Sequence, residues 1–303
     1  MPRALQPGDT VAVVSPSSPV PADRLHAGID VLASWGLQVV EGPAARAAHG
    51  HLAGTDAQRL SDINAAIRDP DVRAVWTSRG GYGLTRILKQ VDWPALRADP
   101  KLLIGFSDVT ALLVAAWQRC GLVAVHGQFV ARLHLQDLTT LESLRRLVFG
   151  VSETHVAPAA GTIAGTGLVE GPLVGGNLAV LAALAGTPDQ VRAGGCILLL
   201  EEVAEAPYRI DRMLTQLRAS GCLDGVRGVA LSRPVECDPQ PGAASASFDE
   251  VVEDRLGDLG VPVLTGLAVG HTDDQQPVLH GGTAMLDADR RELRQTVSSA
   301  AAV

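Results

Sequence analysis

Short apolar runs alternate along the chain with longer stretches in which apolar residues recur every three or four positions. The short runs predict strands and the longer stretches predict amphipathic helices. Strands are expected at residues 10–14, 37–40, 72–77, 102–105, 196–200, 228–231 and 263–269. Helices are expected at 22–36, 56–68, 109–119, 177–185 and 210–218, with another after Gly83. This rhythm predicts an α/β protein with a Rossmann-like N-terminal parallel sheet flanked by helices, followed by a C-terminal α/β domain.

The pattern lapses between Val151 and Gly171, where Gly, Thr, Ala and Pro are frequent. We therefore expect an N-terminal domain at residues 1–150, a linker at 151–170 and a C-terminal domain at 171–303. A chain of 303 residues is long enough for two domains of ordinary size.

The formal net charge of −8 argues against a general nucleic-acid binder, because phosphate contact calls for a basic face. The first apolar run, 11–14, is too short for a signal peptide, and the run around 178–184 is too short to span a membrane. No two of the four cysteines form a CxxC pair, which favours reduced thiols. We expect a cytoplasmic protein without a membrane or nucleic-acid partner.

Ser107 follows an apolar strand that ends in Gly105, and a helical pattern begins just after it. This layout is typical of a nucleophile elbow, in which a sharp turn exposes the hydroxyl and a helix N-terminus offers N–H donors to an oxyanion. Val109 stands where the full G-x-S-x-G motif has its second glycine. The alternative interpretation is an ordinary helix N-cap, with Asp108 as an acidic residue in the first turn.

A glycine-rich segment, Ser78 to Gly83, directly follows another predicted strand. Adjacent glycines allow the backbone to approach a ligand and to form an anion-binding nest, although a tight turn before a helix explains them equally well. Loops at the carboxyl ends of neighbouring parallel strands line one crevice. We therefore expect this segment to face the same space as Ser107.

Two acids, Glu201 and Glu202, end an apolar strand, and His271 follows a later one. Strand alternation sends the two carboxylates to opposite faces, so one of them is expected to serve a site. A histidine at a strand end is well placed as a general base. Solvated acids and a merely hydrogen-bonded histidine are the alternatives. The order Ser, Glu, His matches the chain order of the α/β-hydrolase triad.

Other motifs do not predict a cofactor or a metal. The segment 165–171 misses the G-x-G-x-x-G pattern by one position, which argues against a dinucleotide site. No acidic residue or cysteine of suitable spacing completes a metal site with His49 and His51, which are expected in an exposed loop. The segment Tyr208 to Arg212 is expected to begin a helix.

Several of these stretches resemble the LD-carboxypeptidase family. They are Ala53 to Arg59, Arg79 to Gly83, Gly105 to Asp108, Gly171 to Asn177, Leu200 to Glu202 with Pro207 to Arg212, and Gly270-His271. The resemblance extends from Gly8 to about Leu286, nearly the whole chain.

The resemblance implies a Ser–His–Glu hydrolase without a cofactor. It implies Ser107 as the nucleophile, His271 as the base and Glu201 as the orienting carboxylate. The N–H groups of Gly81 and Asp108 would form the oxyanion hole. In the family the serine lies in the N-terminal domain, the glutamate and histidine lie in the C-terminal domain, and the enzymes are usually homodimers.

Family members cut the L,D-bond before the terminal D-Ala of muropeptide tetrapeptides or inactivate microcin-C-like aminoacyl nucleotides. We expect the first activity here, because the crossing at 151–171 is too short for a nucleobase-gripping loop. An exopeptidase must recognise a terminal carboxylate, so Arg79, Tyr82 and Arg209 are candidate substrate contacts. The alternative outside this chemistry is a small-anion binding module without catalysis.

The chain departs from the family pattern just after His271. The segment Thr272 to Pro277 is unusually acidic, and His280 stands where a proline is common. Both departures bear on substrate preference.

Overall fold

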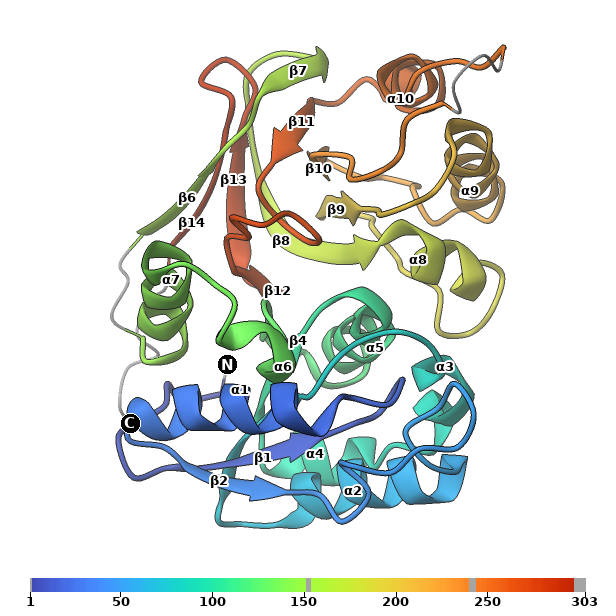
Figure 1. The fold of residues 1–303 in the computed structure, drawn as a ribbon. Coiled ribbons are helices and arrows are strands. Elements are labelled where there is room, and N and C mark those ends of the chain that lie inside the picture. Colours follow the sequence, from blue (N-terminus) through green and yellow to red (C-terminus); the bar gives the residue numbers. More distant parts are fainter. Residues whose placement is uncertain (1, 151–153, 240–243, 297–303) are drawn as a thin grey trace. The chain divides into compact units, whose positions relative to one another are not determined.

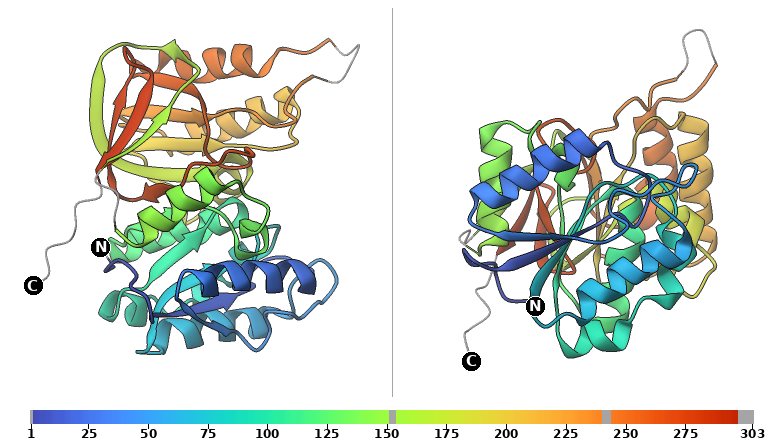
Figure 2. Two further views of the ribbon diagram at one scale, coloured as in Figure 1. Left: turned by 60° about the vertical axis from the view of Figure 1, so that its left-hand side comes forward. Right: turned by 60° about the horizontal axis from the view of Figure 1, so that its bottom comes forward.

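The computed structural model describes residues 2–150, 154–239 and 244–296, which form two compact units (Figure 1). The first unit covers residues 2–150 and the second covers residues 154–296. Each is an α/β structure (Figure 2), in agreement with the predicted fold class.

The sheet strands of the first unit are all parallel to their neighbours and run in the order β2-β1-β3-β4-β5. They are β1 (Thr10–Val14), β2 (Gln38–Glu41), β3 (Val72–Thr77), β4 (Leu102–Gly105) and β5 (Ala124–His126). The strands predicted at 10–14, 72–77 and 102–105 are confirmed, whereas β5 was not predicted. Every residue of β4 is buried, which explains its unbroken apolar sequence.

Helices flank this sheet (Figure 1). They are α1 (Ala22–Ser34), α2 (Asp56–Arg68), α3 (Leu84–Ile87), α4 (Trp93–Ala98), α5 (Thr110–Cys120), α6 (Val130–Leu133) and α7 (Leu138–Val148), with 3-10 turns η1 (Leu88–Gln90) and η2 (Ser107–Val109). A capping box between Thr55 and Gln58 starts α2, and Gly121 ends α5 in the left-handed conformation with φ of 63°. Residues 110–116 of α5 are all buried, so the helix that follows Ser107 is firmly packed.

The second unit contains an eight-stranded sheet in the order β6-β14-β13-β8-β9-β10-β11-β7. Its strands are β6 (Thr154–Pro158), β7 (Gly161–Ala164), β8 (Leu168–Asn177), β9 (Ile197–Glu201), β10 (Gly228–Ser232), β11 (Val263–Leu267), β13 (Thr283–Asp287) and β14 (Glu292–Thr296). Strands β8 to β11 are parallel, and the outer pairs are antiparallel. A short β12 (Val278–His280), the helices α8 (Leu178–Leu184), α9 (Pro207–Ala219) and α10 (Phe248–Leu256) and the turn η3 (Gly257–Leu259) complete the unit.

The segment 151–170, expected to be a linker, instead contributes β6, β7 and the start of β8 to this sheet. Its small residues do not form the apolar runs from which strands are predicted. The partner of β6 is β14, about 140 residues further along the chain, and the partner of β7 is β11, about 100 residues further along. Residues 151–153 of the expected linker lie outside the described residues, as do residues 297–303.

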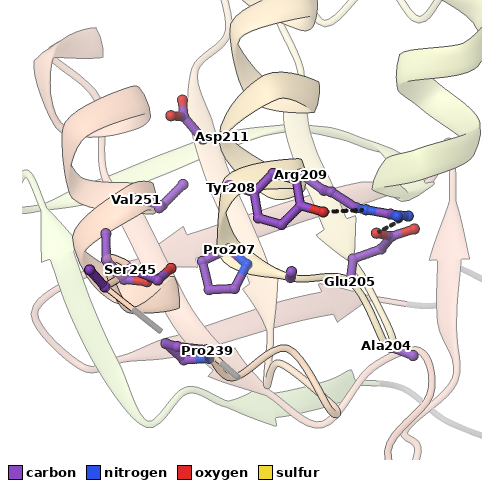
Figure 3. Close-up of a pocket in the computed structure, with 12 residues that line it drawn as sticks. Ala204, Glu205, Pro207, Tyr208, Arg209, Asp211, Pro239, Ser245 and Val251 are labelled. Carbon is purple, nitrogen blue, oxygen red and sulfur yellow. Dashed lines mark hydrogen bonds and ion pairs between the residues drawn. The ribbon is translucent and has the colours of Figure 1, made fainter. Parts of the chain in front are cut away.

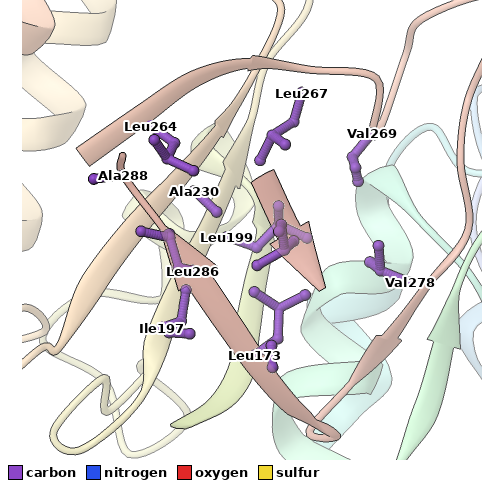
Figure 4. Packing of buried hydrophobic residues seen from close by; sticks show 12 residues of the cluster. Leu173, Ile197, Leu199, Ala230, Leu264, Leu267, Val269, Val278, Leu286 and Ala288 are labelled. Carbon is purple, nitrogen blue, oxygen red and sulfur yellow. The ribbon is translucent and has the colours of Figure 1, made fainter. Parts of the chain in front are cut away.

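A cluster of buried apolar side chains packs on the second sheet (Figure 4). Its members are Leu173, Ile197, Leu199, Ala230, Leu264, Leu267, Val269, Val278, Ala284, Leu286, Ala288 and Leu293. Because the cluster includes residues of β9 and Val269 just beyond β11, it fixes the chain immediately before Glu201 and before His271.

Within the described ranges, no helix is both long and apolar enough to cross a membrane. The four cysteines are free thiols, and three of them are buried.

Candidate active site

Ser107 occupies a strained turn between β4 and the helical residues that follow. Its φ of 59° lies in the left-handed region, which costs a non-glycine residue roughly 1–3 kcal/mol. The N-cap of η2 is Phe106 and that of α5 is Val109, and neither makes a side-chain cap. The N-cap interpretation of Ser107 is therefore wrong, and the strand–turn–helix geometry matches a nucleophile elbow.

The glycine loop, residues 80–83, lies directly against Ser107. A Cβ added to Gly80 would stand 3.2 Å from Ser107 Oγ and 2.7 Å from the ring of Phe129. Gly81 has a φ of 115°, and a Cβ there would stand 2.3 Å from Ser18 Oγ. The loop therefore requires glycine at both positions, and it shares its space with Ser107 as the parallel sheet predicted.

Residues of the loop after β1 hold the glycine loop in place. The N–H of Ser18 donates to Gly80 O at 3.3 Å, and its Oγ accepts from the N–H of Tyr82 at 3.2 Å. The guanidinium of Arg79 donates to Pro19 O at 2.9 Å. Sequence reasoning missed this support. The run of Ser and Pro at the carboxyl end of β1 was its only signal.

The side chain of Asp108 connects the turn at Ser107 with the end of the glycine loop. Its carboxylate is 4% exposed and accepts from Ser17 Oγ at 2.5 Å and from the N–H of Leu84 at 3.0 Å. Burial raises the pKa of Asp108, and these hydrogen bonds oppose the rise. Sequence reasoning gave a role only to the backbone of this residue.

In the second unit, His271 and Glu201 form a close pair. Nδ1 of His271 lies 2.6 Å from Oε2 of Glu201, whose side chain is buried at the end of β9. With the proton on Nδ1 shared with the carboxylate, Nε2 of the imidazole carries the lone pair that a general base needs.

Gly270 brings the histidine to the carboxylate. It has a φ of 86°, and a Cβ there would stand 2.6 Å from Oε2 of Glu201. Only glycine lets the backbone pass this close to the acid, so the Gly-His sequence after β11 is a steric requirement of the pair.

Glu202 points away from the histidine pair, as strand alternation predicted. Its carboxylate accepts hydrogen bonds from Asn177 Nδ2 at 3.1 Å, from the N–H of Ala179 at 2.8 Å and from the N–H of Val203 at 2.9 Å. Both acids are buried, so the interpretation of them as solvated strand-end acids is wrong. Burial, together with the nearby charge of Glu201, raises the pKa of Glu202 to about 7.

The raised pKa of Glu202 predicts that the free energy of unfolding depends on pH and that Glu202→Gln weakens this pH dependence. The folded chain holds this proton more tightly than the unfolded chain, in which the pKa of Glu202 is near 4.5. The stability that Glu202 contributes is therefore fully present below pH 4.5 and is lost as the pH rises through about 7. Between pH 5 and 8 the wild type is expected to lose about 2 kcal/mol more unfolding free energy than Glu202→Gln. Urea unfolding across this range measures the difference. The exposed Glu253→Gln should keep the wild-type slope, and parallel slopes for wild type and Glu202→Gln would contradict the prediction.

The three candidate substrate contacts lie in different surroundings. Tyr82 is 52% exposed, and its ring lies 5.4 Å from that of His51, which is exposed as predicted. Arg79 is bound to the loop after β1. Arg209, in the first turn of α9, contacts the Tyr208 hydroxyl at 3.2 Å and Glu205 at 3.4 Å.

Arg209 borders a cavity of about 690 Å³ in the second unit (Figure 3). The cavity is lined by Ala204, Glu205, Ala206, Pro207, Tyr208, Arg209, Asp211, Pro239, Ala244, Ser245, Ala246 and Val251. Its volume suits a small ligand.

The two departures from the family pattern lie in different surroundings. His280 is fully buried, and its Nε2 accepts from the N–H of Gly175 at 3.1 Å. In the acidic segment 272–277, Asp274 forms an ion pair with Arg233. Among residues 2–150, 154–239 and 244–296, no group of three or more His, Cys, Asp or Glu side chains is arranged to hold a metal ion.

Comparisons with known proteins match both units. The LD-carboxypeptidase N-terminal domain matches residues 11–127, and the LD-carboxypeptidase C-terminal domain matches residues 170–286. A putative carboxypeptidase of Streptomyces coelicolor is 45% identical over 95% of this chain and 93% of its own length. The murein tetrapeptide carboxypeptidase of Pseudomonas aeruginosa is 36% identical over 92% of this chain and 94% of its own.

The fold also matches a solved structure of MccF in complex with glutamyl sulfamoyl guanosine. The TM-score is 0.86 with 97% of each chain covered, and the 23% identity limits this likeness to the fold. The two domain matches and the long alignments with carboxypeptidases agree with one another. The chain therefore belongs to the LD-carboxypeptidase family and is a serine-type carboxypeptidase.

Proposed function

We propose that this carboxypeptidase cleaves the L,D-peptide bond before the terminal D-Ala of muropeptide tetrapeptides, with Ser107, His271 and Glu201 as its triad. The observation that carries the proposal is the 2.6 Å pair of His271 and Glu201, in which Glu201 ends the buried strand β9 and His271 lies in the loop after β11. A carboxylate held on Nδ1 sets the tautomer in which Nε2 accepts a proton. The strained turn at Ser107 supplies a matching nucleophile.

In the proposed reaction, Nε2 of His271 takes the proton of Ser107 Oγ while Oγ attacks the carbonyl carbon of the L-configured residue. The N–H groups of Gly81 and Asp108 stabilise the oxyanion of the tetrahedral intermediate. When the intermediate collapses, the C–N bond breaks and the imidazolium protonates the amine of the departing D-Ala. Water then attacks the acyl-enzyme with His271 as the base, which frees the tripeptide and restores Ser107.

The similarity to a murein tetrapeptide carboxypeptidase supports this substrate. Recognition of the terminal carboxylate falls to a cation, and Arg79 and Arg209 are the proposed candidates. The proposal also places the enzyme in cytoplasmic cell-wall recycling, acting as a homodimer. Hydrolysis of an aminoacyl nucleotide is the second candidate, because the fold matches that of MccF.

A substrate panel read by mass spectrometry tests the proposal. The panel contains L-Ala-D-Glu-meso-diaminopimelate-D-Ala, the same peptide ending in L-Ala, and an aminoacyl sulfamoyl adenosine. We expect release of D-Ala from the first peptide, with turnover of the L-Ala diastereomer lower by at least ~10²-fold, because a misoriented scissile bond loses its near-attack geometry. Preferential cleavage of the adenosine compound would favour the second candidate. Turnover of none of the three would favour an anion-binding module.

A further inference from the structure

The two proposed oxyanion donors come from different segments of the first unit. The N–H of Gly81 belongs to the glycine loop after β3, and the N–H of Asp108 belongs to the turn after β4. Both must point at one oxygen atom, and misplacement by about 1 Å costs on the order of 10²-fold in rate. The fold therefore needs a connection between the two segments other than the neighbouring strands.

The Asp108 carboxylate makes such a connection. The backbone of Asp108 is part of the turn that carries Ser107. Oδ2 of its side chain accepts from the N–H of Leu84, the residue immediately after the glycine loop. A hydrogen bond of 3.0 Å thus joins the donor-bearing residue of one segment to the exit of the other.

Ser17 closes the connection from the side of β1. Its hydroxyl donates to the same oxygen, Oδ2 of Asp108, at 2.5 Å, and both side chains are buried, at 0% and 4% exposure. The next residue, Ser18, holds Gly80 and Tyr82 through its N–H and its hydroxyl. The pair Ser17-Ser18 therefore contacts both donor-bearing segments.

Arg59 compensates the buried charge and secures the far end of the loop. Its guanidinium donates to Gly83 O at 3.0 Å and to Pro16 O, and its charge lowers the pKa of Asp108 against the effect of burial. Charge-assisted hydrogen bonds of this kind are stronger and geometrically tighter than neutral ones. Arg59 therefore fixes Gly83, the residue next to Leu84, whose N–H donates to Asp108.

We propose that the side chains of Asp108 and Ser17 are positioning groups that set the spacing between the two oxyanion donors. This inference rests on the proposed function, in which those donors stabilise the tetrahedral intermediate. A carboxylate that only capped α3 would add stability to the fold without changing the rate of the folded enzyme. Rate and stability therefore separate the two interpretations.

The test compares three variants in the full-length protein. Asp108→Ala removes the connection, Ser17→Ala removes one of its hydrogen bonds, and Asp108→Asn keeps, with its amide oxygen in the place of Oδ2, an uncharged acceptor for both Leu84 N–H and Ser17 Oγ. The control is Asp62→Ala, which removes another buried carboxylate of this unit, one that accepts from the N–H of Ala44 at 2.9 Å.

Two measurements are made on each variant. Steady-state kinetics of D-Ala release give kcat and KM, and a serine-reactive phosphonate gives the rate at which Ser107 is labelled. For folded Asp108→Ala we expect both kcat and labelling to fall by ~10²-fold with KM within about twofold, because only transition-state geometry changes. Ser17→Ala should fall by about tenfold, and Asp108→Asn should stay within about fivefold of wild type. Asp62→Ala should lose thermal stability and keep both rates.

Wild-type rates in folded Asp108→Ala overturn the inference. If that variant does not fold, the inference depends on Ser17→Ala, and wild-type rates there overturn it. Labelling needs no peptide, so the two proposals fail separately. If the variants are labelled more slowly but wild type releases no D-Ala, only the proposed substrate is refuted. If wild type releases D-Ala and the variants keep wild-type kcat and labelling rates, only the positioning role is refuted.

Discussion

Ser107→Ala is expected to reduce D-Ala release by ~10⁴- to 10⁶-fold, because no other atom can replace Oγ as the nucleophile. Alanine and serine tolerate the left-handed φ of 59° about equally, so the turn and the fold should persist. Steady-state kinetics on the tetrapeptide, with circular dichroism and thermal unfolding as checks of folding, measure this effect.

A matched control is Ser34→Ala, which removes an exposed hydroxyl at the end of α1 that donates to Val31 O. It should leave kcat/KM within about twofold of wild type, as expected of a surface change away from the site. Residual activity above ~1% in folded Ser107→Ala would mean that the chemistry does not pass through an acyl-enzyme on this residue.

Much of the site could be predicted because its residues follow buried strands. In a parallel sheet, the end of an apolar run locates a residue at the ligand-binding edge without knowledge of its neighbours. Ser107, the glycine loop and Glu201 all follow such runs, and period-two alternation separated Glu201 from Glu202. Local pattern therefore located these strand-end residues, and the family resemblance supplied the roles proposed for them.

The supporting residues could not be predicted in the same way, because their contacts span long sequence distances. Ser17 meets Asp108 across 91 positions, and nothing near either residue indicates the other. The same limit applies to the fold. Because β6 pairs with β14, near the other end of the second unit's sequence, the local pattern of 151–170 predicted a linker instead of strands. Sequence pattern indicates which residues are buried or lie at a strand end, and tertiary structure decides their partners.

The two adjacent acids show how one strand end serves two purposes. Glu201 faces His271, while Glu202 binds the side chain of Asn177 and the N–H of Ala179 in the first turn of α8. The pair therefore offers an internal control, because the same chemical change at neighbouring positions tests a proposed catalytic contact and a structural one.

Glu201→Gln is expected to lower kcat by ~10³- to 10⁴-fold, whereas Glu202→Gln should stay within about fivefold of wild type. An amide at position 201 can place its NH₂ group against Nδ1 of His271. The imidazole then carries its proton on Nε2, and Nε2 no longer accepts the proton of Ser107 Oγ. Even with the amide oxygen against Nδ1, the imidazolium formed during the reaction loses a charged partner at 2.6 Å.

The measurement is kcat and KM for both variants on the tetrapeptide, together with thermal unfolding. Because Gly270 packs against the Glu201 side chain, a glutamine of the same shape preserves that contact and the variant should fold. Equal losses at positions 201 and 202 would assign the effect to disturbance of the end of β9 and remove Glu201 from the triad. A loss of kcat confined to Glu201→Gln would show that the contact of Glu201 is needed for the reaction and not for folding. This is the result expected of a carboxylate that orients the base.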